Sequence, residues 1–526
     1  MPFSVVCPIS RAGRRDVLPG FAFAAAAAAL SFLVEAIAYP RASLTRSPAA
    51  IALHVCAFAI VASATFAVTA RPLFSASAAL VLIALLAVIS NAKYESLREP
   101  FVFTDLSLFS QVFAHPRLYL PFLSAGKVLG IVAAVAVATI GFLLEQPAGT
   151  LARGAAALIA VACVPVCVAL SRRTPLTLDP MADQRRTGFF AAFVAYLVNG
   201  LRREERSAFF RAVDAGPFSR GRPDSTPDVI VIQSESYFDA RRLGACVSSE
   251  PYANLDRARR EAFTQGSLDV PAWGANTMRS EFAMLTGLPS ASLGYSRFYP
   301  YMYVRRACAS LAGWFKRGGY RTLAIHPYHA DFFGRNRAFR FMHFDRFLDI
   351  RDFGGAARIG PYVGDGPVAD AIIAALQEHG DGPVFAFAIT MENHGPLHLE
   401  PVGPGESESR HTLGDDARWR DLTAYLRHVE NADRMIGKLT DYLRKRERPT
   451  VLCFYGDHVP ALTSVFDALE TEPTNSDYFI WRNFANDFGE HRNVRVESLG
   501  AAIQRAMVHV DCTRAASPTG MLQTPA

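Results

Sequence analysis

Carboxylates and imidazoles follow four short apolar runs in the second half of this chain of 526 residues. Glu235 follows DVIVIQS, His326 follows TLAI, the segment 392–394 follows VFAFAITM, and Asp457 and His458 follow VLCFYG. One such ending is readily explained as a cap or a turn, but four of them are harder to explain in that way. Carboxylate oxygens together with imidazole nitrogens suit a divalent ion such as Mn²⁺ or Zn²⁺. Because cysteine is absent from these endings, the pattern argues against a structural zinc site.

Thr277 is the candidate nucleophile. It lies in WGANTMRSEFAMLTGLPS, where Gly-Ala-Asn is turn-like and the residues up to Gly287 have a helical pattern, so Thr277 falls at a helix start. Threonine at this position favours the role of an N-cap, and a helix start also attracts phosphate through its free N–H groups. A metal bound to the hydroxyl would lower its pKa and make it a nucleophile near neutral pH. The local sequence favours the cap and leaves both roles open.

The elements that must position these residues form an α/β pattern. The apolar runs have the length and composition of buried strands, and helical patterns such as 308–318, 367–378 and 421–446 lie between them. Strands that alternate with helices imply a sheet covered on both faces. In such sheets the ligand lies beyond the carboxyl ends of the strands. We therefore expect the polar strand endings to meet at one edge of the sheet.

The first third of the chain has the composition of a membrane region. The whole chain is 51% hydrophobic and 19% charged, whereas soluble globular proteins contain about a quarter charged residues. Residues 1–171 contain only 11 of the 54 Lys and Arg residues and 6 of the 48 Asp and Glu residues. Runs close to the ~20 residues needed to span a bilayer lie at about 17–38, 49–70, 72–91, 128–144 and 154–171. They predict a bundle of about five transmembrane helices over residues 1–171.

The charges around these runs predict the orientation. Basic residues before the first run favour a cytoplasmic N-terminus, so five crossings would place the chain after residue 171 outside the cytoplasm; Arg172 and Arg173 do not fit this rule. Segment 92–124 mixes aromatic, charged and proline residues and is expected at the membrane interface. Glu35 and His54 fall within predicted spans, where ionisable groups are often functional, but we expect structural roles for both.

Three further regions follow the predicted bundle. Residues 172–227 contain a short apolar segment, 188–201, expected as an amphipathic helix along the bilayer surface, and a turn-rich linker. The catalytic domain is expected at 228–510, followed by a polar tail at 511–526. The net charge of +6 includes no basic run, so no nucleic-acid partner is expected.

Five motifs together resemble the lipoteichoic-acid-synthase and phosphoglycerol-transferase group of the alkaline phosphatase–sulfatase superfamily. They are DVIVIQSES, NTMRSEFAMLTG, HPYHADFFGRNRAF, ENHGP and YGDH, within residues 228–490. The resemblance implies an N-terminal α-helical transmembrane bundle followed by an α/β sulfatase-like domain with a central, mostly parallel sheet. It also implies a multi-pass protein of the bacterial inner membrane whose catalytic domain is extracytoplasmic.

The resemblance implies a role for each motif residue. One divalent metal ion, Mn²⁺ in the first place with Mg²⁺ or Zn²⁺ as alternatives, would be held by Glu235, Thr277, Asp457 and His458. Thr277 would also be the nucleophile. The substrate-binding residues would be His326, Phe333, Arg335 and His394. This chain departs from the lipoteichoic-acid enzymes at Phe333, where they have Trp, and at Tyr328, where they have an acidic residue. Both positions belong to recognition of glycerol phosphate, so the transferred group and the acceptor stay open.

The implied activity is transfer of phosphoglycerol from phosphatidylglycerol to an extracytoplasmic glycan or polymer through a phosphothreonine intermediate. Phosphoethanolamine transferases and phosphodiesterase- or sulfatase-type hydrolases of the superfamily are the alternatives, and a non-catalytic membrane receptor or scaffold is the alternative of another class. Thr277-Met278-Arg279 lacks the Cys/Ser-x-Pro-x-Arg stretch of sulfatases. The four Cys residues after the membrane region do not match the disulfide-rich phosphoethanolamine transferases, although outside the cytoplasm a Cys246–Cys308 disulfide is allowed.

Overall fold

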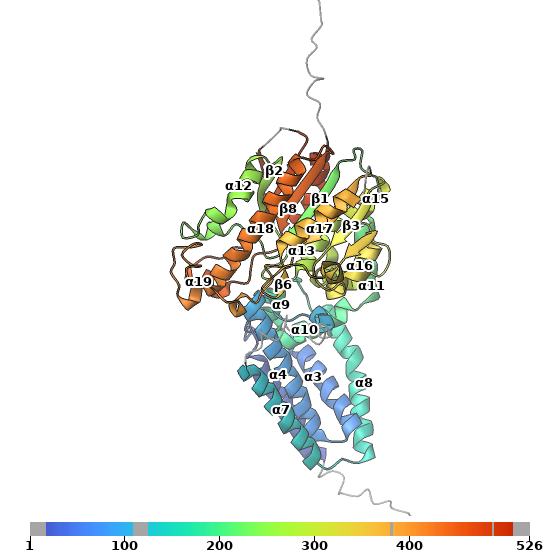
Figure 1. Cartoon of the computed structure of the whole chain (residues 1–526). Helices are drawn as coiled ribbons and strands as arrows, with labels where there is room; N and C mark the ends of the chain where they lie inside the picture. Colours follow the sequence, from blue (N-terminus) through green and yellow to red (C-terminus); the bar gives the residue numbers. More distant parts are fainter. Residues whose placement is uncertain (1–16, 109–124, 379–381, 486–488, 509–526) are drawn as a thin grey trace, which may run out of the picture. The chain divides into compact units, whose positions relative to one another are not determined.

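The chain folds into two compact units (Figure 1). The structure is a computed structural model that describes residues 17–108, 125–378, 382–485 and 489–508. The first unit contains the residues up to Phe209 together with Leu293–Tyr299. The second contains Phe210–Ser292 and the residues from Pro300 onward.

Apolar helices build the first unit. The five long ones are α2 (Val17–Glu35), α3 (Pro48–Thr69), α4 (Pro72–Leu97), α7 (Ala125–Leu144) and α8 (Thr150–Arg173). Within the described residues, α3, α4 and α8 are long and apolar enough to cross a membrane, whereas the described apolar parts of α2 and α7 are shorter. The start of α3 shows how such a helix is defined: the Ser47 hydroxyl accepts from the Ala50 amide at 3.2 Å, and Pro48 occupies the first turn.

One expectation for the first unit needs correction, and a second stays a prediction. Residues 189–200 do form a helix, α10 (Phe189–Gly200), but residues 189–196 are all buried, and the helix packs against α3 and α8. It is apolar around its whole circumference, and such a helix is buried rather than laid along a surface. In segment 92–124, residues 92–97 complete α4 and Phe103–Leu108 form a 3-10 helix. Residues 109–124, like the predicted tail 511–526, lie outside the described residues.

Glu35 and His54 are buried and have partners inside the first unit. Glu35 pairs with Arg46, and its second oxygen accepts the Phe190 amide at 2.7 Å, at the start of α10. His54 Nε2 lies 2.7 Å from the Ser31 hydroxyl. These contacts join helices to one another, which is the structural role expected for both residues.

A mostly parallel sheet is the centre of the second unit. Its strands are β1 (Asp228–Ser234), β2 (Thr264–Asp269), β3 (Arg321–Ile325), β4 (Arg346–Leu348), β7 (Val384–Ile389), β8 (Thr450–Gly456), β9 (Ser476–Arg482), β10 (Glu490–His491) and β11 (Val494–Arg495). Their order is β10-β2-β9-β8-β1-β7-β3-β4, with β11 also paired to β2. Strands β8, β1, β7, β3 and β4 are parallel, and β9 is antiparallel to both of its neighbours. A separate hairpin joins β5 (Arg358–Ile359) and β6 (Tyr362–Val363).

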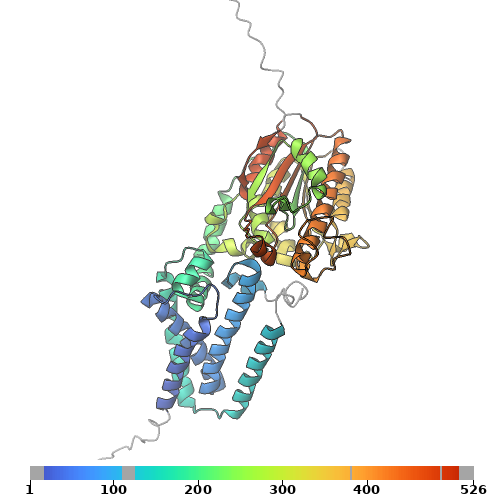
Figure 2. The ribbon, with the colours of Figure 1, turned by 90° about the vertical axis from the view of Figure 1, so that its left-hand side faces the viewer.

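The helices of the second unit cover the sheet on both sides (Figure 2). On one face, Ile230 and Ile232 of β1 join a core with α12 (Ala253–Arg260), α17 (Asp365–Glu378) and α18 (Arg420–Arg444). The other helices are α13 (Thr277–Thr286), α14 (Pro300–Tyr303), α15 (Leu311–Arg317), α16 (Arg335–Phe341), α19 (Thr463–Ala468) and α20 (Leu499–Met507). The predicted fold class, an apolar helical region followed by an α/β domain with a mostly parallel sheet, is confirmed. Cys246 and Cys308 are both free thiols, so no disulfide joins them.

Gly456, at the end of β8, is a position where the fold tolerates no side chain. A Cβ there would lie 1.9 Å from the Tyr237 carbonyl oxygen and 2.1 Å from the Ser476 hydroxyl. Gly456→Ala should therefore lower the free energy of unfolding by about 1–3 kcal/mol, as overpacking does. At Gly366, in α17, nothing lies within 4 Å of the added Cβ, so Gly366→Ala should be neutral or slightly stabilising. Thermal unfolding of the two full-length variants tests this, and equal stability would contradict it.

Candidate active site

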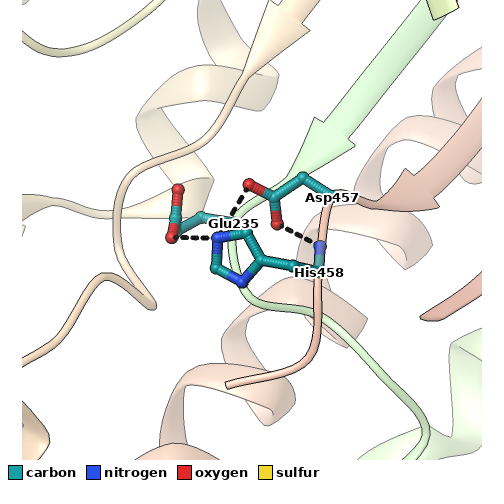
Figure 3. Close-up of side chains that lie close together, drawn as sticks. All are labelled: Glu235, Asp457 and His458. Carbon is teal, nitrogen blue, oxygen red and sulfur yellow. Dashed lines mark hydrogen bonds and ion pairs between the residues drawn. The ribbon is translucent and has the colours of Figure 1, made fainter. Parts of the chain in front are cut away.

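Glu235, Asp457 and His458 meet directly beyond the carboxyl ends of β1 and β8. The register pairs Ser234 with Gly456, so the next residue of each strand leaves the sheet beside the other. His458 Nε2 lies 3.3 Å from Asp457 Oδ2 and 3.6 Å from Glu235 Oε1. Figure 3 shows the imidazole nitrogen facing an oxygen of both carboxylates. All three side chains are buried.

The hydrogen bonds of this cluster leave a set of acceptors that fits a divalent cation. His458 Nδ1 lies 2.9 Å from the Val459 carbonyl, which only an N–H can satisfy, so Nε2 is the ring nitrogen that remains for a metal ion. Asp457 Oδ1 accepts the amides of Ser236 and His458, each at 2.8 Å. Asp457 Oδ2 and His458 Nε2 are buried without any hydrogen-bond partner. Burying an acceptor atom without a hydrogen-bond partner destabilises the folded protein. Carboxylate oxygens together with an imidazole nitrogen are also ligands that Mn²⁺ and Zn²⁺ accept.

The charges of Glu235 and Asp457 also favour a cation at this cluster. Burial, and next the neighbouring Glu235 carboxylate, raise the pKa of Asp457 to about 7. Two carboxylates forced together away from water disfavour the charged form. A cation held between them would reverse that balance and keep both ionised.

Thr277 is the first residue of α13, and its hydroxyl faces this cluster. The residue in the N-cap position is Asn276, and the Thr277 hydroxyl donates to Glu235 Oε2 at 3.4 Å. It also interacts with the Asp457 carboxylate. The structure therefore brings together all four residues that the resemblance assigned to the metal.

Non-glycine residues with positive φ flank the site. Ser236 (φ 52°) follows Glu235, and Asn276 (φ 68°) precedes Thr277. Phe333 (φ 56°) belongs to the predicted substrate loop. Each conformation costs about 1–3 kcal/mol and persists only where the surroundings enforce it. Strain of this kind is often found at functional sites, and here it occurs beside Glu235, beside Thr277 and in the predicted substrate loop.

Arg335 and His326 lie side by side and are almost fully buried. Arg335 Nη1 donates to His326 Nε2 at 3.2 Å, while His326 Nδ1 faces the Ile389 carbonyl at 3.3 Å. The other edge of the guanidinium binds Glu281, through Nε at 3.1 Å and Nη2 at 2.8 Å. Burial, and next the Arg335 charge, hold the pKa of His326 well below its usual range. His326 is thus a neutral imidazole, and one edge of Arg335 is already occupied by a carboxylate.

The two remaining predicted residues lie in neighbouring loops. Phe333 is buried, with the Arg335 guanidinium carbon 5.2 Å from its ring centre. His394 is half-buried, and its Nδ1 lies 2.7 Å from the Gly395 carbonyl and 3.4 Å from the Tyr362 hydroxyl.

The sequence pattern missed Tyr362 and Glu281. Tyr328 and Tyr362 lie between the two histidines. The ring centre of Tyr328 lies 6.2 Å from that of His326 and 6.2 Å from that of Tyr362. The ring centre of Tyr362 lies 5.5 Å from that of His394. Tyr362 lies in the small β5–β6 hairpin, outside every motif, so only the fold could place it. Glu281 was within a motif, and its spacing of four residues from Thr277 puts both on one helix face.

Comparison with known proteins assigns this architecture to a family. The family model described as Sulfatase matches residues 227–500. The chain belongs to the sulfatase family. It is 30% identical over 487 residues to the capsular polysaccharide biosynthesis protein RkpI of Rhizobium meliloti, covering 86% of each chain. It is 29% identical over 306 residues to a putative cyclic β-1,2-glucan modification protein of the same organism, covering 56% of this chain and 46% of the other.

A solved structure shares the fold along most of this chain. The lipooligosaccharide phosphoethanolamine transferase A (EptA) of Neisseria meningitidis, an integral membrane protein, superposes with a TM-score of 0.53 at 14% identity, covering 87% of each chain. The sulfatase-family assignment confirms the resemblance that the five motifs indicated. It supports an enzyme of the alkaline phosphatase–sulfatase superfamily, with an N-terminal membrane anchor and a candidate divalent-metal site.

A second buried cluster supports the loop that carries His394 in this sulfatase-family domain. His428 of α18 places Nδ1 3.0 Å from Glu392 and Nε2 3.0 Å from Glu400, so one imidazole joins both ends of the loop. Asn431 also donates to Glu392, at 2.5 Å. Burial lowers the pKa of His428, but the hydrogen bonds and charges of the two glutamates outweigh it and raise the pKa to about 9.

Asp457 offers a direct test of the metal site. Asp457→Asn keeps the shape of the side chain but removes the charge, so the purified full-length protein should lose most of its bound Mn²⁺ while it stays folded. Asp269→Asn, at the exposed end of β2, is the matched control and should keep the metal. Metal content by mass spectrometry and the rise in melting temperature with added Mn²⁺ measure the effect. Full occupancy in Asp457→Asn would remove this residue from the site.

His428 predicts a pH dependence of stability. Its pKa is higher in the folded protein, about 9, than the ~6.5 of an unfolded histidine. The stabilisation is therefore complete below about pH 6.5 and is lost as the pH rises through about 9, with a size on the order of 3 kcal/mol at most. Between pH 7 and pH 10, His428→Asn should lose less stability than the wild type. His398→Asn, at an exposed position, should keep the wild-type slope. If the stability of wild type and His428→Asn changed with pH in the same way, the pH dependence would not come from a charged His428 between the two glutamates.

Proposed function

We propose that the protein transfers phosphoglycerol from phosphatidylglycerol to a hydroxyl group of an extracytoplasmic glycan or polymer. The observation that carries the proposal is the Thr277 hydroxyl at a helix start, facing a buried carboxylate–imidazole cluster that has unpartnered acceptor atoms. The helix start supplies free N–H groups for a phosphate, and the cluster supplies the ligands of a cation. A nucleophile, a cation site and a phosphate site in one place are the parts that phosphoryl transfer needs.

The acceptor class rests on the relatives. RkpI is named for capsular polysaccharide biosynthesis, and the second relative for cyclic β-glucan modification. Both names concern a bacterial saccharide, so an envelope glycan is the acceptor that we propose for this chain. A bilayer donor and an envelope acceptor place the protein in the bacterial inner membrane. Its anchor would be multi-pass, with the catalytic domain outside the cytoplasm.

The proposed roles of the metal residues follow from their geometry. Glu235, Thr277, Asp457 and His458 would hold one divalent ion, Mn²⁺ in the first place. When bound, it supplies positive charge that lowers the pKa of the Thr277 hydroxyl and offsets charge on the phosphoryl oxygens. Glu235, which accepts the Thr277 hydroxyl bond, orients the nucleophile.

The transfer takes two steps. In the first, the Thr277 hydroxyl gives up its proton, Oγ1 forms a bond to phosphorus, and the bond from phosphorus to the diacylglycerol oxygen breaks. The leaving oxygen takes a proton and departs as diacylglycerol, while phosphoglycerol stays on Thr277. In the second, the glycan hydroxyl loses its proton and attacks the same phosphorus, the bond from phosphorus to Thr277 Oγ1 breaks, and Oγ1 takes up a proton. Over the two steps the glycan oxygen replaces the diacylglycerol oxygen on the same phosphorus atom.

The two histidines have different roles in this scheme. His326 has both ring nitrogens engaged and is held neutral, so it is a poor proton donor. We assign the proton transfers to His394, whose Nδ1 lies against the Gly395 carbonyl, which leaves Nε2 to exchange protons with leaving group and acceptor. Arg335 offers the phosphate its Nη1 edge, because Glu281 holds the other edge.

A phosphoethanolamine transferase is the competing candidate, since EptA shares the fold. The hydroxyl groups of the tyrosines between the histidines can hydrogen-bond to a polyol such as glycerol, while their ring faces suit a cation, so the charge balance around them decides between the two headgroups. The Glu400 carboxylate interacts with Tyr362 but is paired with Arg427 and His428. An ammonium group would have to compete with those pairs.

Thr277 variants test the proposal. Thr277→Val keeps the shape and removes the hydroxyl, so diacylglycerol release from labelled phosphatidylglycerol should fall at least about 10³-fold. Thr277→Ser keeps a hydroxyl and should retain measurable activity. A donor pulse without acceptor should leave phosphoglycerol on the Thr277 peptide of the wild type, detected by mass. Normal turnover in Thr277→Val would sink the mechanism, and a larger rate with phosphatidylethanolamine would shift the donor to the competing class.

A further inference from the structure

A continuous chain of buried polar side chains runs from the nucleophile helix to the substrate side of the site. Tyr301 donates to Glu281 Oε1 at 2.6 Å, Glu281 accepts Arg335 Nε and Nη2, and Arg335 Nη1 donates to His326 Nε2 at 3.2 Å. The four side chains are each at most 1% exposed. The chain ends where His326 Nδ1 donates to the Ile389 carbonyl of β7.

Each bond in this chain has a defined direction. The Ile389 carbonyl can only accept, so the His326 proton is on Nδ1, and Nε2 is the acceptor of the Arg335 N–H. A guanidinium has no acceptor atom, so its orientation is set by the carboxylate that it faces. Among the described residues, Arg335 forms its ion pair with Glu281. The orientation of both substrate-side groups thus depends on one carboxylate.

We propose that Glu281 is a positioning residue that fixes Arg335, and through Arg335 the unprotonated Nε2 of His326, relative to Thr277. The proposal rests on the proposed transfer reaction. Glu281 lies four residues after Thr277 in α13, so one turn of helix carries both the nucleophile and the anchor of the phosphate-side cation. The separation between nucleophile and guanidinium is then set by rigid backbone rather than by a loop, and small errors in such a separation have large kinetic costs.

Glu281 also changes what Arg335 can do for a substrate. An arginine with a free fork binds a phosphate through two parallel N–H bonds. Here Nε and Nη2 are taken by Glu281, so a phosphate would meet the Nη1 edge, beside His326 Nε2. Arg335 is in this arrangement a fixed cation that offers a phosphate its Nη1 edge. Glu281 leaves this edge because it binds Nε and Nη2.

The test is Glu281→Gln in the full-length enzyme, which keeps the shape and removes the charge that orients Arg335. With phosphatidylglycerol as donor, we expect kcat to fall about tenfold or more and KM to change less than about threefold, because the loss concerns alignment. Glu281→Asp keeps the charge and should recover part of kcat. Asp228→Asn is the matched control: it removes another buried carboxylate paired with arginines, at the start of β1. It should cost stability and leave kcat unchanged.

Two further readouts separate positioning from general stability. If Glu281 acts through Arg335, the double variant Glu281→Gln/Arg335→Gln should be no slower than Arg335→Gln alone. In ¹⁵N-histidine spectra, His326, assigned through His326→Gln, should show one protonated and one acceptor nitrogen in the wild type and lose that pattern in Glu281→Gln. Additive kinetic losses, an unchanged His326 pattern or an unchanged kcat would each overturn the proposal. A wild type that releases no diacylglycerol would refute the proposed function instead, and the spectra would still test Glu281.

Discussion

The in-register parallel pairing of β1 with β8 is the constraint on which the rest of the site depends. It places Ser234 opposite Gly456, so the two following residues, Glu235 and Asp457, leave the sheet as neighbours. Two neighbouring ionised carboxylates repel each other, and burial away from water strengthens the repulsion. The fold withstands this because backbone amides and a threonine hydroxyl bind the oxygens, and the two carboxylates with His458 form a candidate cation site.

Buried charge is used in three different ways around this centre. At the candidate metal site Asp457 Oδ2 and His458 Nε2 lack hydrogen-bond partners, which suits a bound cation. At Glu281 and Arg335 the charges satisfy each other, which fixes a direction and leaves one donor edge. At His428 a protonated imidazole joins two glutamates and supports the loop of His394. A buried pair such as Glu281 with Arg335 seldom adds much stability, since desolvation cancels most of the attraction. Its effect here is to hold side chains in one arrangement.

The residues of the site come from separate elements, each placed by the sheet. The strand ends of β1 and β8 supply the carboxylates, the start of α13 supplies the hydroxyl, and the loops after β3 and β7 supply the histidines. Ligand sites beyond the carboxyl ends of parallel strands are a general feature of α/β sheets. The strained backbone at Ser236, Asn276 and Phe333 is tolerated because it lies in these short connections, where side-chain direction matters more than regular hydrogen bonding.

The sequence by itself determined the α/β fold class, the apolar helical anchor and the motifs around Glu235, Thr277, Asp457 and His458, because strand periodicity, length of apolar runs and polar strand endings are local properties. It could not place α10, which is apolar on every side and whose burial depends on its neighbours, and it gave no role to Tyr362 or Glu281. Only the tertiary structure decided that Asn276 rather than Thr277 is the N-cap, that His326 is neutral and that Glu281 holds only one edge of Arg335. Those properties depend on contacts between residues far apart in the chain, such as Glu281 with Arg335 and Tyr362 with His394, and no local pattern encodes which partner a side chain meets.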